Sequence, residues 1–201
     1  MGVYDFLKSV RRLGRQNKYA RMLNGRMPIF SSFGSNIYAS DVVQQACYCI
    51  VKEVKKLTPR HIRMNGADVV PVGGRLQAVL DDPNAVMTTA KMLERIAWSY
   101  LLTYNAWIIP ARDEAGRVVA FWPVNPQRVT FIEDQGGRLA VTLEFADNTE
   151  TTVFYSDVIH VCHHYHENDY LGGDANGNPD YSAILQTVEL NDTLMQGVAK
   201  G

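Results

Sequence analysis

Four of the five histidines in this 201-residue chain stand in one stretch, Val158 to Asp169, with the sequence VIHVCHHYHEND. They are His160, His163, His164 and His166, and Cys162 lies among them. Imidazole nitrogens and thiolates are ligands that Zn²⁺ prefers in proteins, and a bound zinc ion can activate water for hydrolysis. The stretch therefore raises the hypothesis of a metal-dependent hydrolase that uses the His160–His166 cluster.

Strand geometry limits such a zinc site. The apolar residues before the histidines indicate a β-strand, on which His160, Cys162 and His164 share one face. Neighbours two apart are roughly 6.6 Å from each other and can share a metal, whereas residues four apart, at about 13 Å, cannot. Further ligands would have to come from the rest of the chain, where the choice is His61, Cys47, Cys49 and carboxylates.

Cys47 and Cys49 do not supply the missing pair, because residues two apart diverge by about 200° around a helix. The chain also has no Gly-x-Ser-x-Gly, no His-Glu-x-x-His and no phosphate-cradling Gly-rich loop with a lysine. We therefore favour a structural strand with hydrogen-bonding histidines, and expect no enzyme, no catalytic residue, no metal and no cofactor. The metal-dependent hydrolase stays open as the alternative function.

Basic side chains are concentrated at the start of the chain. Residues 1–40 contain seven Lys and Arg residues against the single acid Asp5, although the whole chain has a net charge of −1. This asymmetry indicates an arm that contacts a polyanion or an acidic partner, or else a solvated basic helix. The candidate contact residues are Lys8, Arg11, Arg12, Arg15, Lys18 and Arg21. A nucleic-acid-binding module based on this arm is a second alternative function.

Residues 22–39 mix Gly, Pro, Ser and Asn with apolar side chains. This composition predicts an extended arm that must dock on a protein surface to be ordered. The candidate contact residues of the arm are Ile29, Phe30, Phe33, Ile37 and Tyr38. These side chains would pack either on another subunit or back on their own domain.

Two long amphipathic helices are predicted. Ser40 is the expected N-cap of the first helix, and Pro59 follows its end. Its predicted buried stripe is Val43, Ala46, Cys47, Ile50, Val51, Val54 and Leu57. The second helix is expected to start at Thr88 or Thr89 and to continue to Tyr104.

From Ala106 the pattern changes to strands separated by turn residues. The predicted hairpins pair 106–112 with 117–124, 128–133 with 138–146, and 150–155 with 157–165. Antiparallel hairpins packed with two long helices predict an α+β fold. We accordingly divide the chain into a basic helix and arm (1–39), an α+β domain (40–181) and a C-terminal helix (182–201).

Several segments, read in order, resemble the portal proteins of tailed bacteriophages. The segments are MGVYDFLKSVRR at the start, PIFSSFGSNIYASDVVQQACYCIVKEVKKLTPRHIR from Pro28, YLLTYNAWIIPARDEAGRVVAFWPVNPQRVTF from Tyr100, and YSDVIHVCHHYHENDYLGGD from Tyr155. The resemblance is strongest in Phe33 to Asp41, in Asn105-Ala106, in the Pro-Val-Asn-Pro of 123–126 and in the Asp-Val-Ile-His of 157–160. It spans nearly the whole chain and depends on the order of the segments.

The resemblance implies a structural protein of the phage head, the head-tail connector. In that family, subunits form a ring of roughly a dozen copies at one capsid vertex, a closed cyclic assembly. Double-stranded DNA is packaged through the ring by terminase and later ejected through it, without sequence-specific contacts. The implied partners are therefore other copies of the chain, terminase, capsid and head-completion proteins, and DNA. No membrane partner is expected.

The resemblance also implies a place for each part of the chain. Residues 40–181 resemble the portal wing, with the strand at 157–160 as a structural strand, and the helix from 182 resembles the one that leads to the stem. The chain thus looks like the N-terminal half of a portal subunit. The implied location is the virion, with assembly in the host bacterial cytoplasm. The gene would belong to a phage or to a prophage. The arm residues would contact a neighbouring subunit or the capsid.

Overall fold

The computed structural model describes residues 21–22, 41–134, 136–163 and 168–173, together with residues 177, 179 and 190. The helices in this part of the chain are α3 (Asp41–Val54), α4 (Arg75–Asp81), α5 (Thr89–Thr103) and the 3₁₀ helix η2 (Tyr155–Asp157). The strands are β1 (Arg21–Met22), β2 (Ile62–Asn65), β3 (Asp68–Pro71), β4 (Asn105–Arg112), β5 (Val118–Val124), β6 (Arg128–Glu133), β7 (Leu139–Glu144), β8 (Glu150–Phe154) and β9 (Ile159–Cys162).

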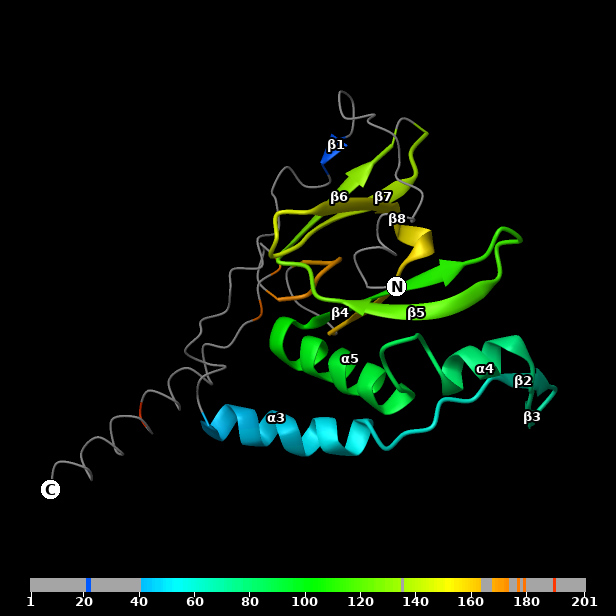
Figure 1. Ribbon diagram of the computed structural model, residues 1–201. Helices are drawn as coiled ribbons and strands as arrows, with labels where there is room; N and C mark the ends of the chain where they lie inside the picture. Colours follow the sequence, from blue (N-terminus) through cyan, green and yellow to red (C-terminus); the bar gives the residue numbers. More distant parts are fainter. Residues whose placement is uncertain are drawn as a thin grey trace, which may run out of the picture.

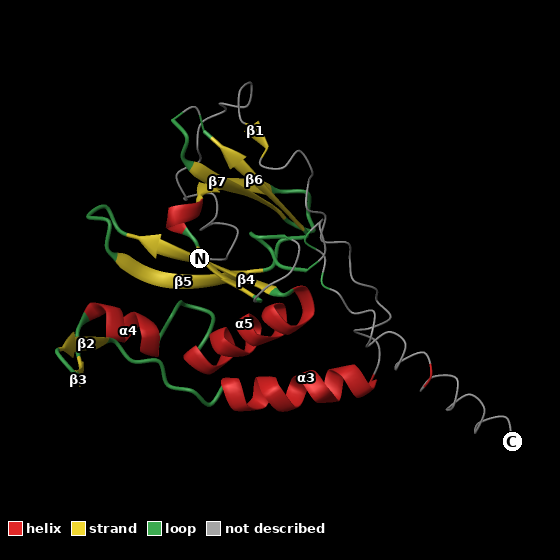
Figure 2. Cartoon of the chain, turned by 180° about the vertical axis from the view of Figure 1, so that it is seen from behind, coloured by secondary structure: helices red, strands yellow, loops and turns green. Residues whose placement is uncertain are grey.

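These elements form layers (Figures 1 and 2). An antiparallel sheet of order β5-β4-β9 lies between α5 and α4 on one side and a second antiparallel sheet, β1-β6-β7-β8, on the other. Helix α3 packs on the outer side of α5, and the separate β2-β3 hairpin lies at the end of α4. The predicted α+β fold is confirmed.

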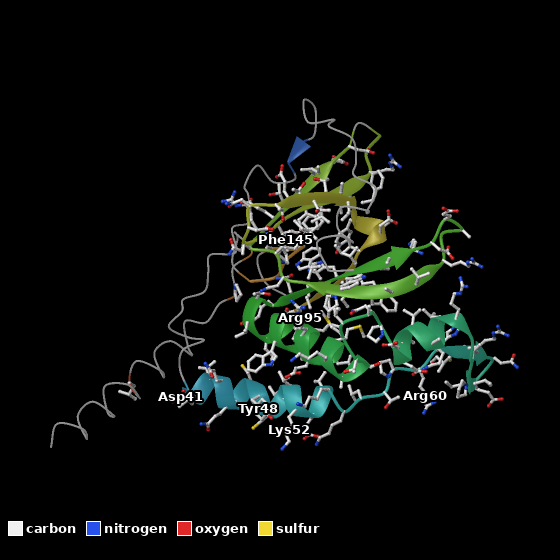
Figure 3. All side chains as sticks on the ribbon, viewed as in Figure 1. Asp41, Tyr48, Lys52, Arg60, Arg95 and Phe145 are labelled. Carbon is white, nitrogen blue, oxygen red and sulfur yellow. The ribbon has the colours of Figure 1, made fainter. Side chains whose placement is uncertain are left out.

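The main core lies between the two sheets, where Figure 3 shows Phe145. Trp107 and Ile109 of β4 contact residues such as Phe131, Val141 and Leu143 of the second sheet. Ile108, the residue between them, belongs to a second cluster with Val79 of α4, Met92 of α5 and Phe121. Because side chains alternate across a strand, β4 is buried on both faces, and this explains its nearly continuous apolar sequence.

The third predicted hairpin, 150–155 with 157–165, is wrong. β8 pairs with β7, whereas β9 pairs with β4 in the other sheet. The helix η2 turns the chain between them, so that two strands adjacent in sequence enter different sheets. Sequence spacing favours pairing of neighbouring strands. Here β9 pairs instead with β4, some fifty residues earlier in the chain.

The helix α3 begins at Asp41, and Ser40, its predicted N-cap, lies outside the described residues. The helix α5 begins as predicted. The Thr88 hydroxyl accepts a hydrogen bond from the Lys91 N–H and is the N-cap of α5. The Thr89 hydroxyl donates to the carbonyl groups of Leu80 and Asp81, so the start of α5 is bonded to α4. Met92 and Ala97 of α5 are buried, and Ile96 packs against the second cluster.

The predicted buried stripe of α3 is correct only in part. Val51 is buried, and Val43, Cys47 and Val54 are half-buried against the rest of the domain. Ala46 and Ile50 are exposed, and so is Leu57, which lies beyond the end of α3. The helix α5 packs on one side of α3. The apolar residues of α3 spread over a wider arc than this one neighbour can cover, so some of them stay exposed. None of the described helices is long and apolar enough to cross a membrane.

Two β-turns are built alike. In each, an aspartate Oδ1 accepts from the backbone N–H two and four residues later, and Oδ2 pairs with an arginine four residues on. The pairs are Asp113 with Arg117 in the β4-β5 turn and Asp134 with Arg138 in the β6-β7 turn. Hydrogen bonding by the arginine N–H holds the pKa of each aspartate below its ordinary value. These side chains set the register of both hairpins locally.

The core between the sheets can be tested with two matched valines. Val141 of β7 is 0% exposed, whereas Val119 of β5 is 44% exposed. We expect Val141→Ala to lower the free energy of unfolding by about 2 kcal/mol, since it removes two buried carbon groups and leaves a cavity. Val119→Ala should change it by less than about 0.5 kcal/mol. Urea unfolding measures both, and equal losses would contradict the assignment of the core.

Candidate functional site

His160, the first histidine of the cluster, lies inside the fold rather than on a reactive surface. It is on β9 directly opposite Trp107 of β4. The two rings are stacked with centroids 3.8 Å apart and planes 6° apart. The Tyr155 ring lies edge-on to the imidazole. Strand pairing thus places His160 against the main core, between two aromatic side chains.

Both imidazole nitrogens of His160 have partners. Nδ1 lies 3.0 Å from the Tyr155 hydroxyl, and Nε2 lies 2.7 Å from Oδ1 of Asn105. The Asn105 amide nitrogen donates to the carbonyl groups of Thr103 and Leu171, so its oxygen faces the histidine as an acceptor. Nε2 therefore carries the proton, and Nδ1 accepts from Tyr155.

This arrangement favours a neutral imidazole. Burial lowers the pKa of His160 to about 4, because the charged form loses its hydration. At pH 7 the ring is therefore neutral, and its one free lone pair, on Nδ1, accepts the Tyr155 hydroxyl. Neither nitrogen is available as a metal ligand or as a general base without breaking this network.

Asn105 is the polar centre of the network and is 1% exposed. It follows Tyr104, which ends α5 in the left-handed region with φ of 59°. This sharp helix-to-strand turn is further held by the Thr103 hydroxyl, which donates to the carbonyl groups of Ser99 and Asn105. Sequence reasoning singled out Asn105-Ala106 as part of a resemblance but did not predict this contact with His160.

His163 has a different environment. Its ring is exposed and stacks on Tyr104 with centroids 4.6 Å apart, and its backbone N–H donates to the Tyr104 carbonyl. Gly172 lies beneath its carbonyl, where a Cβ on Gly172 would stand 3.0 Å from the oxygen. His163 is therefore held at the end of α5 by a backbone hydrogen bond as well as by ring stacking.

The described residues do not assemble the hydrolase site that the sequence suggested. His61 donates its backbone N–H to Gln77 of α4, and Cys47 and Cys49 are on α3. Within the described ranges no three His, Cys, Asp or Glu side chains come together as a metal site. His164 and His166 lie outside the described residues.

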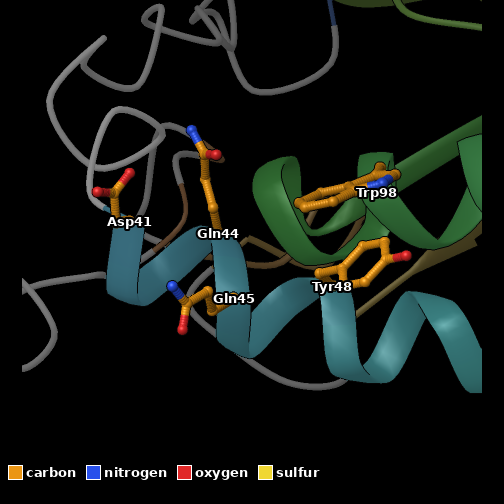
Figure 4. Close-up of a pocket in the computed structure, with 5 residues that line it drawn as sticks. All are labelled: Asp41, Gln44, Gln45, Tyr48 and Trp98. Carbon is orange, nitrogen blue, oxygen red and sulfur yellow. The ribbon is translucent and has the colours of Figure 1, made fainter.

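A hollow of about 270 Å³ lies between α3 and α5, and sequence reasoning missed it (Figure 4). Its lining residues are Asp41, Gln44, Gln45 and Tyr48 of α3 and Trp98 of α5. The Tyr48 and Trp98 rings lie side by side, and the polar groups stand towards the start of α3. The only sequence signal was the Gln44-Gln45 pair within an apolar helix. A carboxylate, two amides and two rings form a binding surface but no nucleophile-and-base pair.

Two further sets of predicted residues fall outside the described part of the chain. The apolar arm residues are Ile29, Phe30, Phe33, Ile37 and Tyr38. The basic residues are Lys8, Arg11, Arg12, Arg15 and Lys18, and for Arg21 only the backbone is described, in β1 opposite Glu133 of β6.

Comparisons with known proteins agree with one another. The sequence model of the family described as "Phage portal protein" matches residues 41–200. No curated protein matches the chain. Among solved structures, a chain of the neck of an empty gene transfer agent particle, with C6 symmetry, is similar with a TM-score of 0.63 and 12% identity. That match covers 83% of this chain and 44% of the other.

Two more solved chains have the same fold. A chain from the virion of a native gene transfer agent particle has a TM-score of 0.61 and 12% identity. A chain from the neck of the native particle, with C12 symmetry, has a TM-score of 0.60 and 11% identity. Each match covers 83% of this chain and 43% of the other, so this chain spans less than half the length of the chains it resembles.

The neutral state of His160 predicts a pH dependence of stability. In the folded protein the pKa of His160 is about 4, whereas an unfolded histidine has a pKa of about 6.5. The unfolded chain therefore binds more protons, so this contribution is present above pH 6.5 and is lost as the pH falls towards 4. Between pH 7 and pH 5 we expect a loss of about 2 kcal/mol from this group.

Urea unfolding at a series of pH values tests this contribution. The variant His160→Gln cannot titrate and should show a flatter dependence between pH 7 and pH 5, whatever its stability at pH 7. The same slope in both proteins would show that His160 is not a neutral buried histidine.

Gly172 and Gly66 form a matched pair for the loop after β9. Their φ angles are 65° and 66°, but only at Gly172 does an added Cβ meet an atom, the His163 carbonyl oxygen. Gly66→Ala should cost about 1 kcal/mol from backbone strain alone. Gly172→Ala should lower the free energy of unfolding by at least about 1 kcal/mol more than Gly66→Ala does. Thermal unfolding compares them, and equal costs would exclude the close approach.

Proposed function

Because this chain belongs to the phage portal protein family, we propose that it acts as a subunit of a portal ring at one vertex of a phage-like particle. The observation that carries the proposal is the match of the family model over residues 41–200, almost the whole of the described domain. The same fold in neck chains of gene transfer agent particles supports it. The family is a structural one, and the chain is a structural component.

The repeated contact of the ring is supported by the symmetry of the similar structures. The two neck structures were computed with C6 and with C12 symmetry, and a closed ring is built from one contact repeated between identical subunits. Residues 40–181 would form the wing-like domain, and the helix from 182 would lead towards a stem. The location would be the virion, with assembly in the cytoplasm of a bacterial host.

Enzymatic activity is not part of the proposal. The described site residues are used structurally: His160 fills a hydrogen-bond network, and the hollow beside α3 has no catalytic pair. Terminase, capsid and head-completion proteins are the proposed partners. Double-stranded DNA would pass without sequence-specific contacts, which fits a chain whose net charge is −1, because tight phosphate binding needs an excess of basic groups.

The arm residues keep a proposed role at the surface between subunits. Ile29, Phe30, Phe33, Ile37 and Tyr38 would pack on a neighbouring copy or on the capsid. The basic residues from Lys8 to Arg21 would meet an acidic surface there. Residues 41–201 carry more acidic than basic side chains and offer such a surface.

Native mass spectrometry of the chain, with and without a chelator, tests the ring directly. We expect oligomers whose fraction of the total protein rises with protein concentration. Their masses should not change when the chelator is added. The double variant Phe30→Ser, Phe33→Ser should need about tenfold more protein for the same assembly, equivalent to about 1.4 kcal/mol.

Val119→Ser, an exposed change on β5 of the same chemical kind, is the control and should assemble like the parent. A chain that stays monomeric at every concentration would contradict the ring. A zinc ion that the chelator removes would instead support the hydrolase alternative.

A further inference from the structure

The β2-β3 hairpin has one face made entirely of apolar side chains. Opposite residues in the register are Ile62 with Pro71, Met64 with Val69, Arg63 with Val70, and Asn65 with Asp68. Cross-strand partners point to the same side, and neighbours along a strand point to opposite sides. The first two pairs therefore form an apolar face, and the other two form a mixed, mostly polar face.

This apolar face is not covered by the described part of the chain. Ile62, Met64 and Val69 are 47%, 64% and 54% exposed. The hairpin is held at its base instead, where Gln77 of α4 accepts from the His61 N–H and donates to the Pro59 carbonyl. An isolated two-stranded hairpin is at best marginally stable, so its apolar face is expected to pack on another surface.

Helix α3 has a second apolar face, turned away from α5. Val42, Ala46, Cys49 and Ile50 are all exposed. They are spaced four, three and one residues apart, which places them on one side of a helix. This outer face of α3 is distinct from the inner face at Cys47 and Val51, which packs towards α5.

The two surfaces lie at opposite ends of the helical layer (Figure 1). A ring needs one patch on a subunit to meet a different patch on the next, because a contact between two like patches closes at a dimer. An apolar face on a projecting hairpin and an apolar face on a helix at the other end satisfy this requirement.

Charge favours the first half of α3 as the receiving surface. Residues 41–50 carry a single charged side chain, Asp41, whereas residues 51–57, at the end of α3 and just after it, carry Lys52, Glu53, Lys55 and Lys56, a net charge of +2. The segment 60–71 of the hairpin carries Arg60, Arg63 and Asp68, all exposed, a net charge of +1. Docking near Asp41 avoids like charges, and docking near the lysines does not.

We propose that the apolar face of the β2-β3 hairpin in one copy packs on the outer face of α3 in the next copy of the same chain. This inference rests on the proposed ring and names its contact. The occupant is a second copy because both partners are present on this chain, in complementary places.

Native Cys49 lies on the outer face of α3 and allows a direct test by cross-linking. In the variant Met64→Cys, a short bis-maleimide should join residue 64 of one copy to Cys49 of the next. Because the contact runs head to tail, the products should form a ladder beyond dimers on a denaturing gel, with at least about tenfold more product than the parent chain.

Matched controls are available on both elements. Asn65→Cys places the thiol on the opposite face of the same hairpin and should give little cross-linking. Cys49→Ser in the Met64→Cys background should abolish the ladder, whereas Cys47→Ser, on the inner face of the same helix, should leave it. As a second measurement, Val69→Asp should raise the protein concentration needed for assembly by at least about tenfold.

The outcomes separate this contact from the ring itself. Oligomers in native mass spectrometry without the Cys49-dependent ladder would overturn the contact and leave the ring standing. A product within one chain, or one that stops at dimers, would also overturn it. A chain that is monomeric at every concentration would overturn the contact and the ring together.

Discussion

The fold depends on the pairing of β9 with β4. This pairing brings His160 onto the face of Trp107 and within 2.7 Å of Asn105, a buried amide that also holds the carbonyl groups of Thr103 and Leu171. Three separate segments, the end of α5, the strand β9 and the loop near Leu171, therefore meet at one polar group. An unsatisfied amide at that depth would be costly, so the segments are fixed together.

The β5-β4-β9 sheet depends on the same pairing of β9 with β4. Without β9 it would be only the β4-β5 hairpin, and such hairpins are marginal in water. With β9 in place, β4 has neighbours on both edges and is buried on both faces, against the second sheet through Trp107 and Ile109 and against the helices through Ile108. The two hydrophobic clusters of the domain thus meet at a single strand.

Two elements far from β4, the helix α3 and the β2-β3 hairpin, have apolar side chains that the core does not cover. Helix α3 contacts the body through α5, and the β2-β3 hairpin is bonded to α4 through Gln77. Both are held in place by the core yet have apolar faces that the core does not use. A structural subunit needs this division, because its function lies in surfaces presented to other subunits rather than in a catalytic pocket.

The sequence by itself determined the local features. Periodicity identified α5 and the start of α3, turn residues located the first two hairpins, and the ordered motifs identified the family. These depend on neighbouring residues, for which sequence spacing is a direct measure of position. The sequence also predicted correctly that the segment containing His160 is a strand.

Only the tertiary structure decided what that strand does. Spacing predicted β9 as the partner of β8, but it crosses to β4, because Asn105 and Trp107 offer its histidine a hydrogen bond and a ring to stack on. The same holds for α3, whose apolar residues were predicted as one buried stripe and are divided between a covered and an exposed face. Both outcomes depend on residues far away in the chain, and hydrophobic period alone carries no information about which distant surface a face will meet.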